Sequence, residues 1–231
     1  MVRAGTETFA DRETAGRALA EQVEVYLGRQ EAPLRPPLVL ALPRGGVPVG
    51  DEVARTIGAE LDVVVARKIG MPGHPEFGIG AVTADGPPIF NQEVLRRVGL
   101  TGTDLADAVA AERAEARRRL RRYRGDRPPP EIADRIVIVV DDGLATGITA
   151  MAALRSVREE GPRNLAFGAP VCSPDATVSL TAEADAVICV LTPALFTAVG
   201  EFYEDFAQMT DEEVEAILAR SAGTATGRRP R

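Results

Sequence analysis

The chain has 231 residues, a formal net charge of −7 at neutral pH and two cysteines. A chain of this length can bury the full core of one α/β domain, so it needs no disulfide scaffold. Because phosphate contacts need a cationic surface, the negative charge argues against general binding to nucleic acid. No apolar run approaches membrane length, and we expect a cytoplasmic protein.

The two cysteines lie in apolar runs. Cys172 ends the run FGAPVC and Cys189 lies within AVICVL, and neither belongs to a CxxC or another metal-ligand spacing. Free cysteine is among the residues most often buried in folded proteins. The sequence therefore predicts two buried, reduced thiols.

The first half of the chain alternates short apolar runs with helical patterns. Asp11 precedes apolar residues at helical spacing, which indicates a capped amphipathic helix. A later Arg-rich pattern has one apolar stripe and is typical of a helix with a solvated face. In chain order these patterns predict helix 15–27, strand 38–42, helix 47–57, strand 61–66, an irregular loop over 68–80, a hairpin of 78–84 with 88–91, and helix 103–124.

The second half alternates strands and helices. Residues 136–140 are apolar at every position, as expected for a strand covered on both faces, and helix 148–160 and strands 165–171 and 186–191 follow. This alternation is typical of an α/β fold with a Rossmann-like, mostly parallel sheet. We expect one domain over residues 1–220, with its core at about 36–192, and a disordered tail over 221–231.

The strongest functional pattern follows the strand at 136–140. The run IVIVVDDGLATGIT, from Ile136 to Thr149, brings two carboxylates to the carboxyl edge of the sheet, where ligands of open α/β folds bind. The loop then opens a helix, whose free N–H groups and positive dipole end suit a phosphate. Carboxylates accept hydrogen bonds from sugar hydroxyls, so the run predicts a cradle for a ribose 5-phosphate. Its candidate residues are Asp141, Asp142, Gly143, Ala145, Thr146, Gly147 and Thr149.

This run resembles the phosphoribosyl pyrophosphate (PRPP) binding motif of the type I phosphoribosyltransferases, in which apolar residues, an acidic pair and a TGxT end follow in this order. The resemblance implies that Asp141 and Asp142 hold the ribose hydroxyls and that residues 145–149 hold the 5′-phosphate. It also implies the type I phosphoribosyltransferase fold, with a small hood from the terminal segments and here an inserted long helix. Mg²⁺ would accompany PRPP as the cofactor, without a dedicated protein metal site.

A second pattern, Leu42-Pro43-Arg44-Gly45-Gly46, stands at another junction of strand and helix. Guanidinium binds phosphate oxygens in a bidentate manner and keeps its charge. Beside the first motif, this pattern is similar to the pyrophosphate loop of the same family. That similarity implies that Arg44, Gly45 and Gly46 meet the leaving diphosphate, although PRGG alone is also a common turn.

We expect Arg67 and Lys68 at the end of a strand, where they lead into the Pro- and Gly-rich loop, and Lys68 is the single lysine of the chain. The pair resembles the adenine-type members of the family, in which Arg-Lys precedes a mobile catalytic loop. The resemblance implies that Lys68 contacts pyrophosphate and that His74 and Glu76 lie on a lid. For His74 the alternative is an exposed loop residue without a role in the reaction.

Two aromatic residues near the carboxyl end, Phe196 and Tyr203, lie in a segment that is more loosely similar to the family's base-stacking segment. The resemblance implies that one of these rings stacks on the acceptor. The alternative is that both rings fill the core, where aromatic side chains contribute large buried areas.

Together the motifs imply transfer of the ribose 5-phosphate of PRPP to a nitrogenous base by a homo-oligomer in nucleotide salvage, with Arg44, Lys68, Asp141 and Asp142 as catalytic residues. Hypoxanthine and guanine enzymes carry an Asp where this chain has Ala145, which implies weak or no use of those bases. One alternative is a PRPP-sensing regulator of the same fold that binds RNA or DNA through the Arg-rich helix. A second is a PRPP synthetase, but that enzyme resembles a longer chain with two similar domains.

Overall fold

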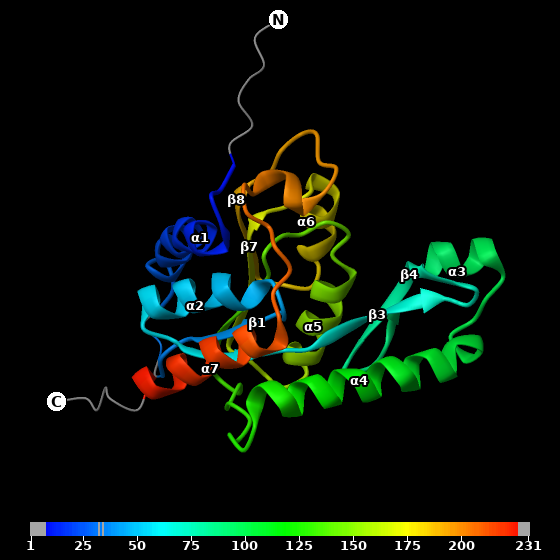
Figure 1. Ribbon diagram of the computed structural model, residues 1–231, viewed down its shortest axis with the longest axis horizontal. Helices are drawn as coiled ribbons and strands as arrows, with labels where there is room; N and C mark the ends of the chain where they lie inside the picture. Colours follow the sequence, from blue (N-terminus) through cyan, green and yellow to red (C-terminus); the bar gives the residue numbers. More distant parts are fainter. Residues whose placement is uncertain (1–7, 32, 34, 226–231) are drawn as a thin grey trace, which may run out of the picture.

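A five-stranded parallel sheet lies at the centre of the computed structural model, which describes residues 8–31, 33 and 35–225 (Figure 1). The strand order is β2-β1-β6-β7-β8, and every neighbouring pair is parallel. Parallel neighbours need a crossover, which the intervening helices provide, so the predicted α/β fold is confirmed. The strands are β1 (Leu38–Ala41), β2 (Glu60–Val63), β6 (Ile136–Val140), β7 (Asn164–Val171) and β8 (Ala186–Leu191).

Helices cover both faces of this sheet. Every residue of β1 and β6 is buried, and alternate side chains enter two different cores. Val39 and Ile138 pack under the first set of helices, whereas Leu40 and Val139 pack under the second. This arrangement explains why the runs are apolar throughout. The first set is α1 (Arg12–Leu27), α2 (Gly46–Ile57) and α7 (Asp211–Ala225), and the second is α5 (Ile148–Arg158) and α6 (Pro174–Leu180).

An arm projects from this body (Figure 1). It consists of an antiparallel sheet, β3 (Ala66–Met71), β4 (His74–Thr83) and β5 (Ile89–Phe90), with α3 (Gln92–Val98) and the first part of α4 (Ala106–Arg124). Ile79, Leu95 and Leu105 form a small core of its own. The predicted hairpin about Asp85 and Gly86 corresponds to β4 with β5.

The prediction of an irregular loop over 68–80 is wrong, because most of this segment forms the β3–β4 hairpin. Glycine weakens most strands, but here it permits close approach: a Cβ on Gly80 would lie 2.5 Å from the carbonyl oxygen of Ile89. Gly73, with a φ of 80°, supplies the left-handed residue of the turn. The run predicted as one strand over 61–66 is divided between β2 of the large sheet and β3 of the arm.

The prediction of two reduced thiols is also wrong, because Cys172 and Cys189 form a disulfide. Cys172 directly follows β7, and Cys189 lies in the neighbouring parallel strand β8. Their Cα atoms are 6.1 Å apart, within the range that a disulfide bridges. A sequence separation of 17 residues gives no sign of this proximity, because it depends on the strand order.

The two terminal segments meet near the carboxyl edge of the sheet. The backbone N–H of Phe9 donates to the carbonyl of Phe202 at 2.8 Å, and the N–H of Glu204 donates to the carbonyl of Phe9 at 2.8 Å. Residues 221–225, predicted to begin a disordered tail, are instead helical in α7, and 226–231 lie outside the described residues. Within the described part of the chain, no helix combines the length and the apolar character that crossing a membrane requires.

Candidate active site

The acidic pair lies where the sequence predicts, directly after the buried strand β6. Asp141 and Asp142 are only partly exposed, and the backbone N–H of Asp142 donates to Oδ1 of Asp141 at 2.9 Å. Oδ2 of Asp142 accepts a hydrogen bond from Arg12. The other oxygen of each carboxylate receives no N–H donor from the described residues. Such oxygens accept hydrogen bonds from sugar hydroxyls or bind hard cations.

The loop after the pair is held by its neighbours on both sides. The backbone N–H of Leu144 donates to the carbonyl of Val171 at 2.8 Å, and Oγ of Ser173 donates to the carbonyl of Ala145 at 2.7 Å. Gly147 precedes α5 with a φ of 74°, a conformation that glycine adopts without strain. The first N–H groups of α5 have no helical acceptor and lie at the end of this loop, where they can bind a phosphate.

The loop after β1 packs directly against the acidic pair. A Cβ on Gly45 would lie 1.8 Å from Oδ2 of Asp142, and a Cβ on Gly46 would lie 2.7 Å from the carbonyl oxygen of Val140. The peptide bond between Pro43 and Arg44 is cis. Since β1 and β6 are neighbours in the sheet, the two sequence motifs form one site at their carboxyl ends.

Arg12, which the sequence motifs do not mark, belongs to this site. Its Nε donates to Oδ2 of Asp142 at 2.8 Å, and its Nη1 donates to the carbonyl of Ala207 at 2.9 Å. Its guanidinium lies 4.0 Å from the ring centroid of Phe206, and its side chain is 12% exposed. No local pattern relates the first residue of a helix to a carboxylate 130 positions later, so only the fold reveals this contact.

The two carboxylates differ in their electrostatic environments. Burial, and then the neighbouring charge of Asp142, raises the pKa of Asp141 well above its usual range. Asp142 is instead paired with the cation of Arg12. Asp141 has no such ion pair among the described residues, so a hydrogen-bond donor or cation that reaches it would stabilise its charged form.

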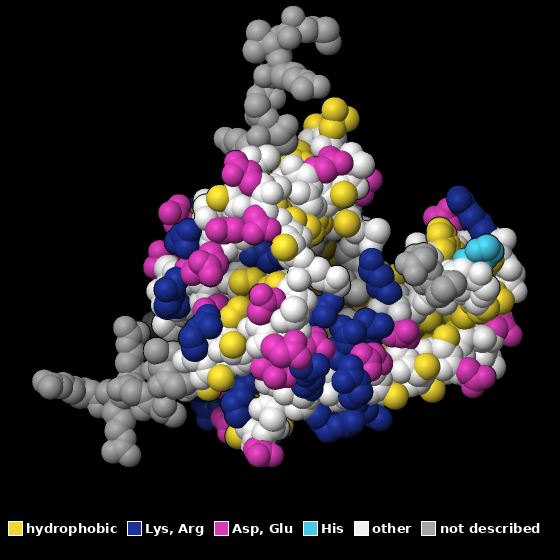
Figure 2. Space-filling model, viewed as in Figure 1, with side chains coloured by type: hydrophobic (Ala, Val, Ile, Leu, Met, Phe, Trp, Pro, Cys, Tyr) yellow, Lys and Arg dark blue, Asp and Glu magenta, His cyan; other side chains and the backbone are white. Residues whose placement is uncertain are grey.

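Lys and Arg side chains gather at the notch between the body and the arm (Figure 2). Arg44 extends toward α7, where its Nη1 lies 3.6 Å from Oδ1 of Asp211. Arg67 and Lys68 lie within β3 rather than at the end of a strand, and Nε of Arg67 donates to Glu112 of α4 at 2.9 Å. Successive residues of a strand point to opposite faces, so the exposed Lys68 points away from α4.

The two residues predicted to lie on a lid belong to the arm. His74 is exposed and begins β4, directly after the hairpin turn. The backbone of Glu76 lies in β4, but its side chain is outside the described residues. The role of both residues in a lid stays a prediction.

Phe196 and Tyr203 both contact a small hydrophobic cluster beside the acidic pair. The buried hydroxyl of Tyr203 donates to the carbonyl of Asp142 at 2.6 Å, and burial raises the pKa of Tyr203 well above its usual range. Phe196 stacks on Phe202, with ring centroids 5.7 Å apart. These are contacts of core packing, and stacking on an acceptor base stays a prediction for both rings.

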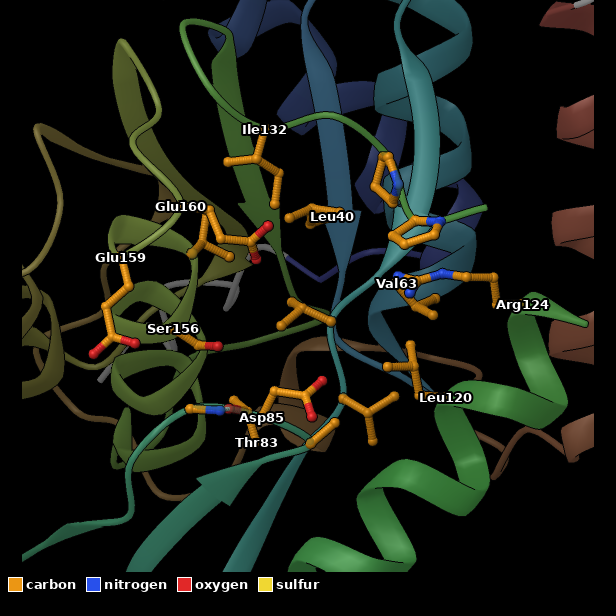
Figure 3. Close-up of a pocket in the computed structure, with 17 residues that line it drawn as sticks. Leu40, Val63, Thr83, Asp85, Leu120, Arg124, Ile132, Ser156, Glu159 and Glu160 are labelled. Carbon is orange, nitrogen blue, oxygen red and sulfur yellow. Dashed lines mark hydrogen bonds between the residues drawn. The ribbon is translucent and has the colours of Figure 1, made fainter. Parts of the chain in front are cut away.

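A cavity of about 420 Å³ lies elsewhere, between the second half of α4 and α5 (Figure 3). Leu40, Val63 and Leu120 contribute its apolar wall, and Asp85 and Glu160 also line it. Its lining includes none of the predicted site residues. The candidate active site is therefore the sheet edge formed by the two loops.

Comparison with known proteins agrees with this geometry. Residues 11–191 match the model of the phosphoribosyl transferase domain. The chain belongs to the phosphoribosyl transferase family. The match includes both loops of the candidate site and most of the elements that position them.

Two proteins with sequences similar to this chain match 92% of it. The crystal structure of TT1426 from Thermus thermophilus is 46% identical, with a TM-score of 0.76, over 92% of this chain and 98% of that one. The "Putative phosphoribosyl transferase Rv0571c" of Mycobacterium tuberculosis is 40% identical over 213 residues, 92% of this chain and 47% of its own length. The chain thus spans about half the length of that curated relative. A uracil phosphoribosyltransferase of Rhizobium meliloti is 45% identical over 47 residues, 20% of this chain and 22% of that protein.

Proposed function

We propose that the chain transfers the 5-phosphoribosyl group of PRPP to a nitrogenous base and releases pyrophosphate. The observation that carries the proposal is the contact between two loops at one sheet edge, in which Gly45 packs against the carboxylate of Asp142. The loop after β6 suits a ribose 5-phosphate, and the loop after β1 offers Arg44 to a diphosphate. Membership of the phosphoribosyl transferase family supports the same ligand.

In the proposed reaction, the bond between C1 of the ribose and the pyrophosphate oxygen breaks, and a bond forms from C1 to a nitrogen of the acceptor. Positive charge develops on the ribose and negative charge on the leaving group, as in glycoside hydrolysis. Asp141 and Asp142 orient the ribose through its hydroxyls, while residues 145–149 hold the 5′-phosphate. Arg44 and Lys68 stabilise the negative charge that develops on the leaving pyrophosphate. This stabilisation is the largest contribution of the site to the rate in our proposal.

The proposed cofactor is Mg²⁺, because carboxylate oxygens are the hard ligands that this ion prefers. One oxygen each of Asp141 and Asp142 receives no N–H donor from the described residues. When bound with PRPP, the ion would supply further neutralisation of charge on the diphosphate. The chain's own contribution there is the fixed positive charge of Arg44 and Lys68. Asp141 and Asp142 keep their role in orienting the ribose.

The acceptor, in our proposal, is a base other than hypoxanthine or guanine. Ala145 is exposed in the phosphate loop, and its methyl group can neither accept a proton nor hydrogen-bond a base. An acid at this position would assist proton transfer, which typically contributes about 10²- to 10⁴-fold in rate. Adenine is the first candidate, because Arg67 and Lys68 resemble the adenine-type pair.

A screen of bases with PRPP and Mg²⁺, with pyrophosphate release as the readout, tests the proposal. The panel is adenine, uracil, orotate, hypoxanthine and guanine. We expect release with at least one base outside the last two, and loss of that release when Asp141 and Asp142 are both changed to Asn. Efficient use of hypoxanthine or guanine contradicts the choice of acceptor, while tight PRPP binding without release for any base contradicts the transferase activity.

A further inference from the structure

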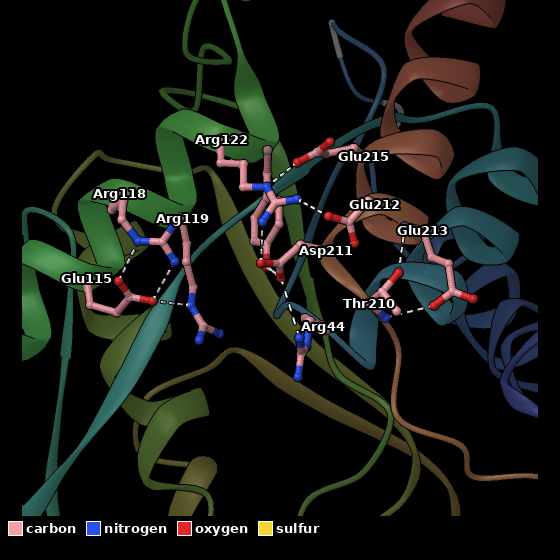
Figure 4. A network of polar contacts seen from close by, with 11 residues as sticks. Arg44, Glu115, Arg118, Arg119, Arg122, Thr210, Asp211, Glu212, Glu213 and Glu215 are labelled. Carbon is pink, nitrogen blue, oxygen red and sulfur yellow. Dashed lines mark hydrogen bonds and ion pairs between the residues drawn. The ribbon is translucent and has the colours of Figure 1, made fainter.

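Asp211, a carboxylate outside both motifs, contacts several polar side chains beside the loop that follows β1. Asp211 is the first residue of α7, and its side chain is 15% exposed. Its Oδ1 accepts a hydrogen bond from the hydroxyl of Tyr123 at 2.5 Å and lies 3.6 Å from Nη1 of Arg44. Its Oδ2 accepts from Nη1 of Arg122 at 2.7 Å. Figure 4 shows Arg44 and Arg122 converging on the carboxylate of Asp211.

Asp211 is anchored independently of Arg44. Tyr123 and Arg122 both belong to α4, Tyr123 is buried, and Nη2 of Arg122 also donates to the exposed Glu212 at 2.6 Å. The hydrogen bond from Tyr123 first, and then the charges of Arg122 and Arg44, lowers the pKa of Asp211. The carboxylate is therefore ionised at neutral pH and held in place by contacts to a neighbouring helix.

Arg44, in contrast, has a single ion-pair partner for its guanidinium in the described part of the chain, and that partner is Asp211. A separation of 3.6 Å makes the contact an ion pair rather than a hydrogen bond, so the N–H donors remain available to a phosphate oxygen. The side chain of Arg44 is 27% exposed. A long side chain binds more tightly when its conformation is fixed beforehand, because less rotamer freedom is lost on binding.

We propose that Asp211 is a positioning residue for Arg44, which it holds where the guanidinium meets the leaving pyrophosphate. The inference rests on the proposed function, because it takes Arg44 as a ligand of pyrophosphate. It gives α7 and the second half of α4 a part in the site, although neither helix carries a PRPP-binding motif.

A positioning role and a purely electrostatic role predict opposite results. If Asp211 only added negative charge near an anion site, its neutralisation would strengthen pyrophosphate binding, because like charges repel. If Asp211 positions Arg44, its neutralisation weakens binding, and the weakening requires that Arg44 be present.

The test is a double-mutant cycle of Asp211→Asn and Arg44→Ala, in which PRPP and inorganic pyrophosphate, each with Mg²⁺, are titrated calorimetrically into the full chain. We expect Asp211→Asn to weaken both affinities on the order of tenfold, the scale of one charge-assisted hydrogen bond from Arg44 to the diphosphate. It should have no further effect in the Arg44→Ala chain. Glu212→Gln is the matched control, because Glu212 lies in the same turn of α7 and contacts Arg122 but not Arg44. Its affinities should stay within about twofold of the original ones.

A second variant covers the case in which Asp211→Asn does not fold. Tyr123→Phe removes the hydroxyl that anchors Asp211 but keeps every charge, so it should weaken PRPP binding less, and again only when Arg44 is present. Unchanged or tighter binding in the folded variant, or an equal loss without Arg44, overturns the inference. If the unmodified chain binds neither PRPP nor pyrophosphate, the proposed function fails first, and that outcome is distinct from a failure confined to Asp211.

Discussion

Among single residues, Asp141 has an environment that disfavours its charged form. Burial and the charge of Asp142 raise its pKa above the ordinary value of 3.8. Between the ordinary pKa and the higher pKa of the folded chain, the folded chain binds more protons than the unfolded one, so the free energy of unfolding falls as pH rises. The ionised form of Asp141 therefore destabilises the ligand-free protein at neutral pH. This is expected of a group whose charge a bound ligand would stabilise.

Asp141→Asn should accordingly raise the melting temperature of the free protein at about pH 7, by roughly 2–4 °C for each kcal/mol relieved. The amide oxygen of Asn can still accept the N–H of Asp142, so the loop should be kept. The gain should shrink as the pH falls to about 3, where the Asp141 carboxyl is largely protonated in both folded and unfolded chains. Melting curves across this pH range measure the effect, and a lower melting temperature at neutral pH with an intact fold would contradict it.

Lys68→Ala should lower turnover on the order of 10²-fold, the usual scale for removing one preorganised stabiliser of developing charge. PRPP affinity should suffer less, because the contacts to ribose and 5′-phosphate remain. Arg97, an exposed arginine of α3 that pairs with Glu93, provides the matched control, and Arg97→Ala should leave turnover unchanged. Steady-state kinetics with the acceptor found in the base screen decides, and normal turnover would make Lys68 an ordinary surface cation.

The sequence indicates some residues of the site and not others for a physical reason. Asp141, Asp142 and Arg44 each lie at the end of an apolar strand, so their local pattern places them at the carboxyl edge. Arg12 and Asp211 are the first residues of terminal helices, and their importance depends on contacts to distant parts of the chain. No spacing rule reaches so far, and the fold is needed to find them.

At the scale of elements, the two loops of the site form a close contact that leaves no room for a side chain. Gly45 touches the carboxylate of Asp142, and Val199 of the terminal segment packs over Gly143 at the other side of the pair. The phosphate loop, the pyrophosphate loop and the terminal segment are therefore positioned by one another. The geometry at the acidic pair depends on all three.

Gly45→Ala should disturb this contact, because its Cβ would lie 1.8 Å from Oδ2 of Asp142 and one group must shift. Such overpacking typically costs about 1–3 kcal/mol, and we expect weaker PRPP binding as well as a lower melting temperature. Gly28→Ala is the control, since a Cβ there would meet nothing closer than 3.4 Å. Equal PRPP affinity for the Gly45 variant and the unmodified chain would show that the loops do not position one another.

The elements differ in how far local sequence determines them. The apolar strands β1 and β6 were predictable because burial on both faces requires apolar residues throughout. The β3–β4 hairpin was not predictable, because glycine and proline usually interrupt a strand. Here the close approach of a neighbouring strand explains the glycine at position 80. The disulfide likewise depends on β7 and β8 being neighbours in the sheet.

At the scale of the whole molecule, acidic side chains of the same chain form ion pairs with most arginines of α4. Five of its arginines pair with acids of the body and of α4 itself, so neighbouring carboxylates balance much of the charge of the basic stretch. The pairs include Arg117 with Asp85, Arg118 and Arg119 with Glu115, Arg122 with Asp211, Glu212 and Glu215, and Arg124 with Asp62. These pairs and the net charge of −7 argue against general binding to nucleic acid, which needs a cationic surface.

RNA and DNA should therefore bind weakly or not at all, even at low salt and with PRPP present. Fluorescence anisotropy with labelled single- and double-stranded oligonucleotides is the measurement, because electrostatic binding would be strongest under those conditions. Binding that responds to PRPP and is lost when arginines 117–124 are changed would instead favour a regulator of the same fold.

The most direct measurement of the central claim is a calorimetric titration of PRPP with Mg²⁺ into the unmodified chain and into the chain with Asp141→Asn and Asp142→Asn. Both carboxylates lose their charge in the double variant, and with it their strongest hydrogen bonds to the ribose hydroxyls. We predict that PRPP binds the unmodified chain and that no binding is detected for the folded double variant. Equal affinity for the two chains would contradict the claim that this sheet edge is a PRPP site.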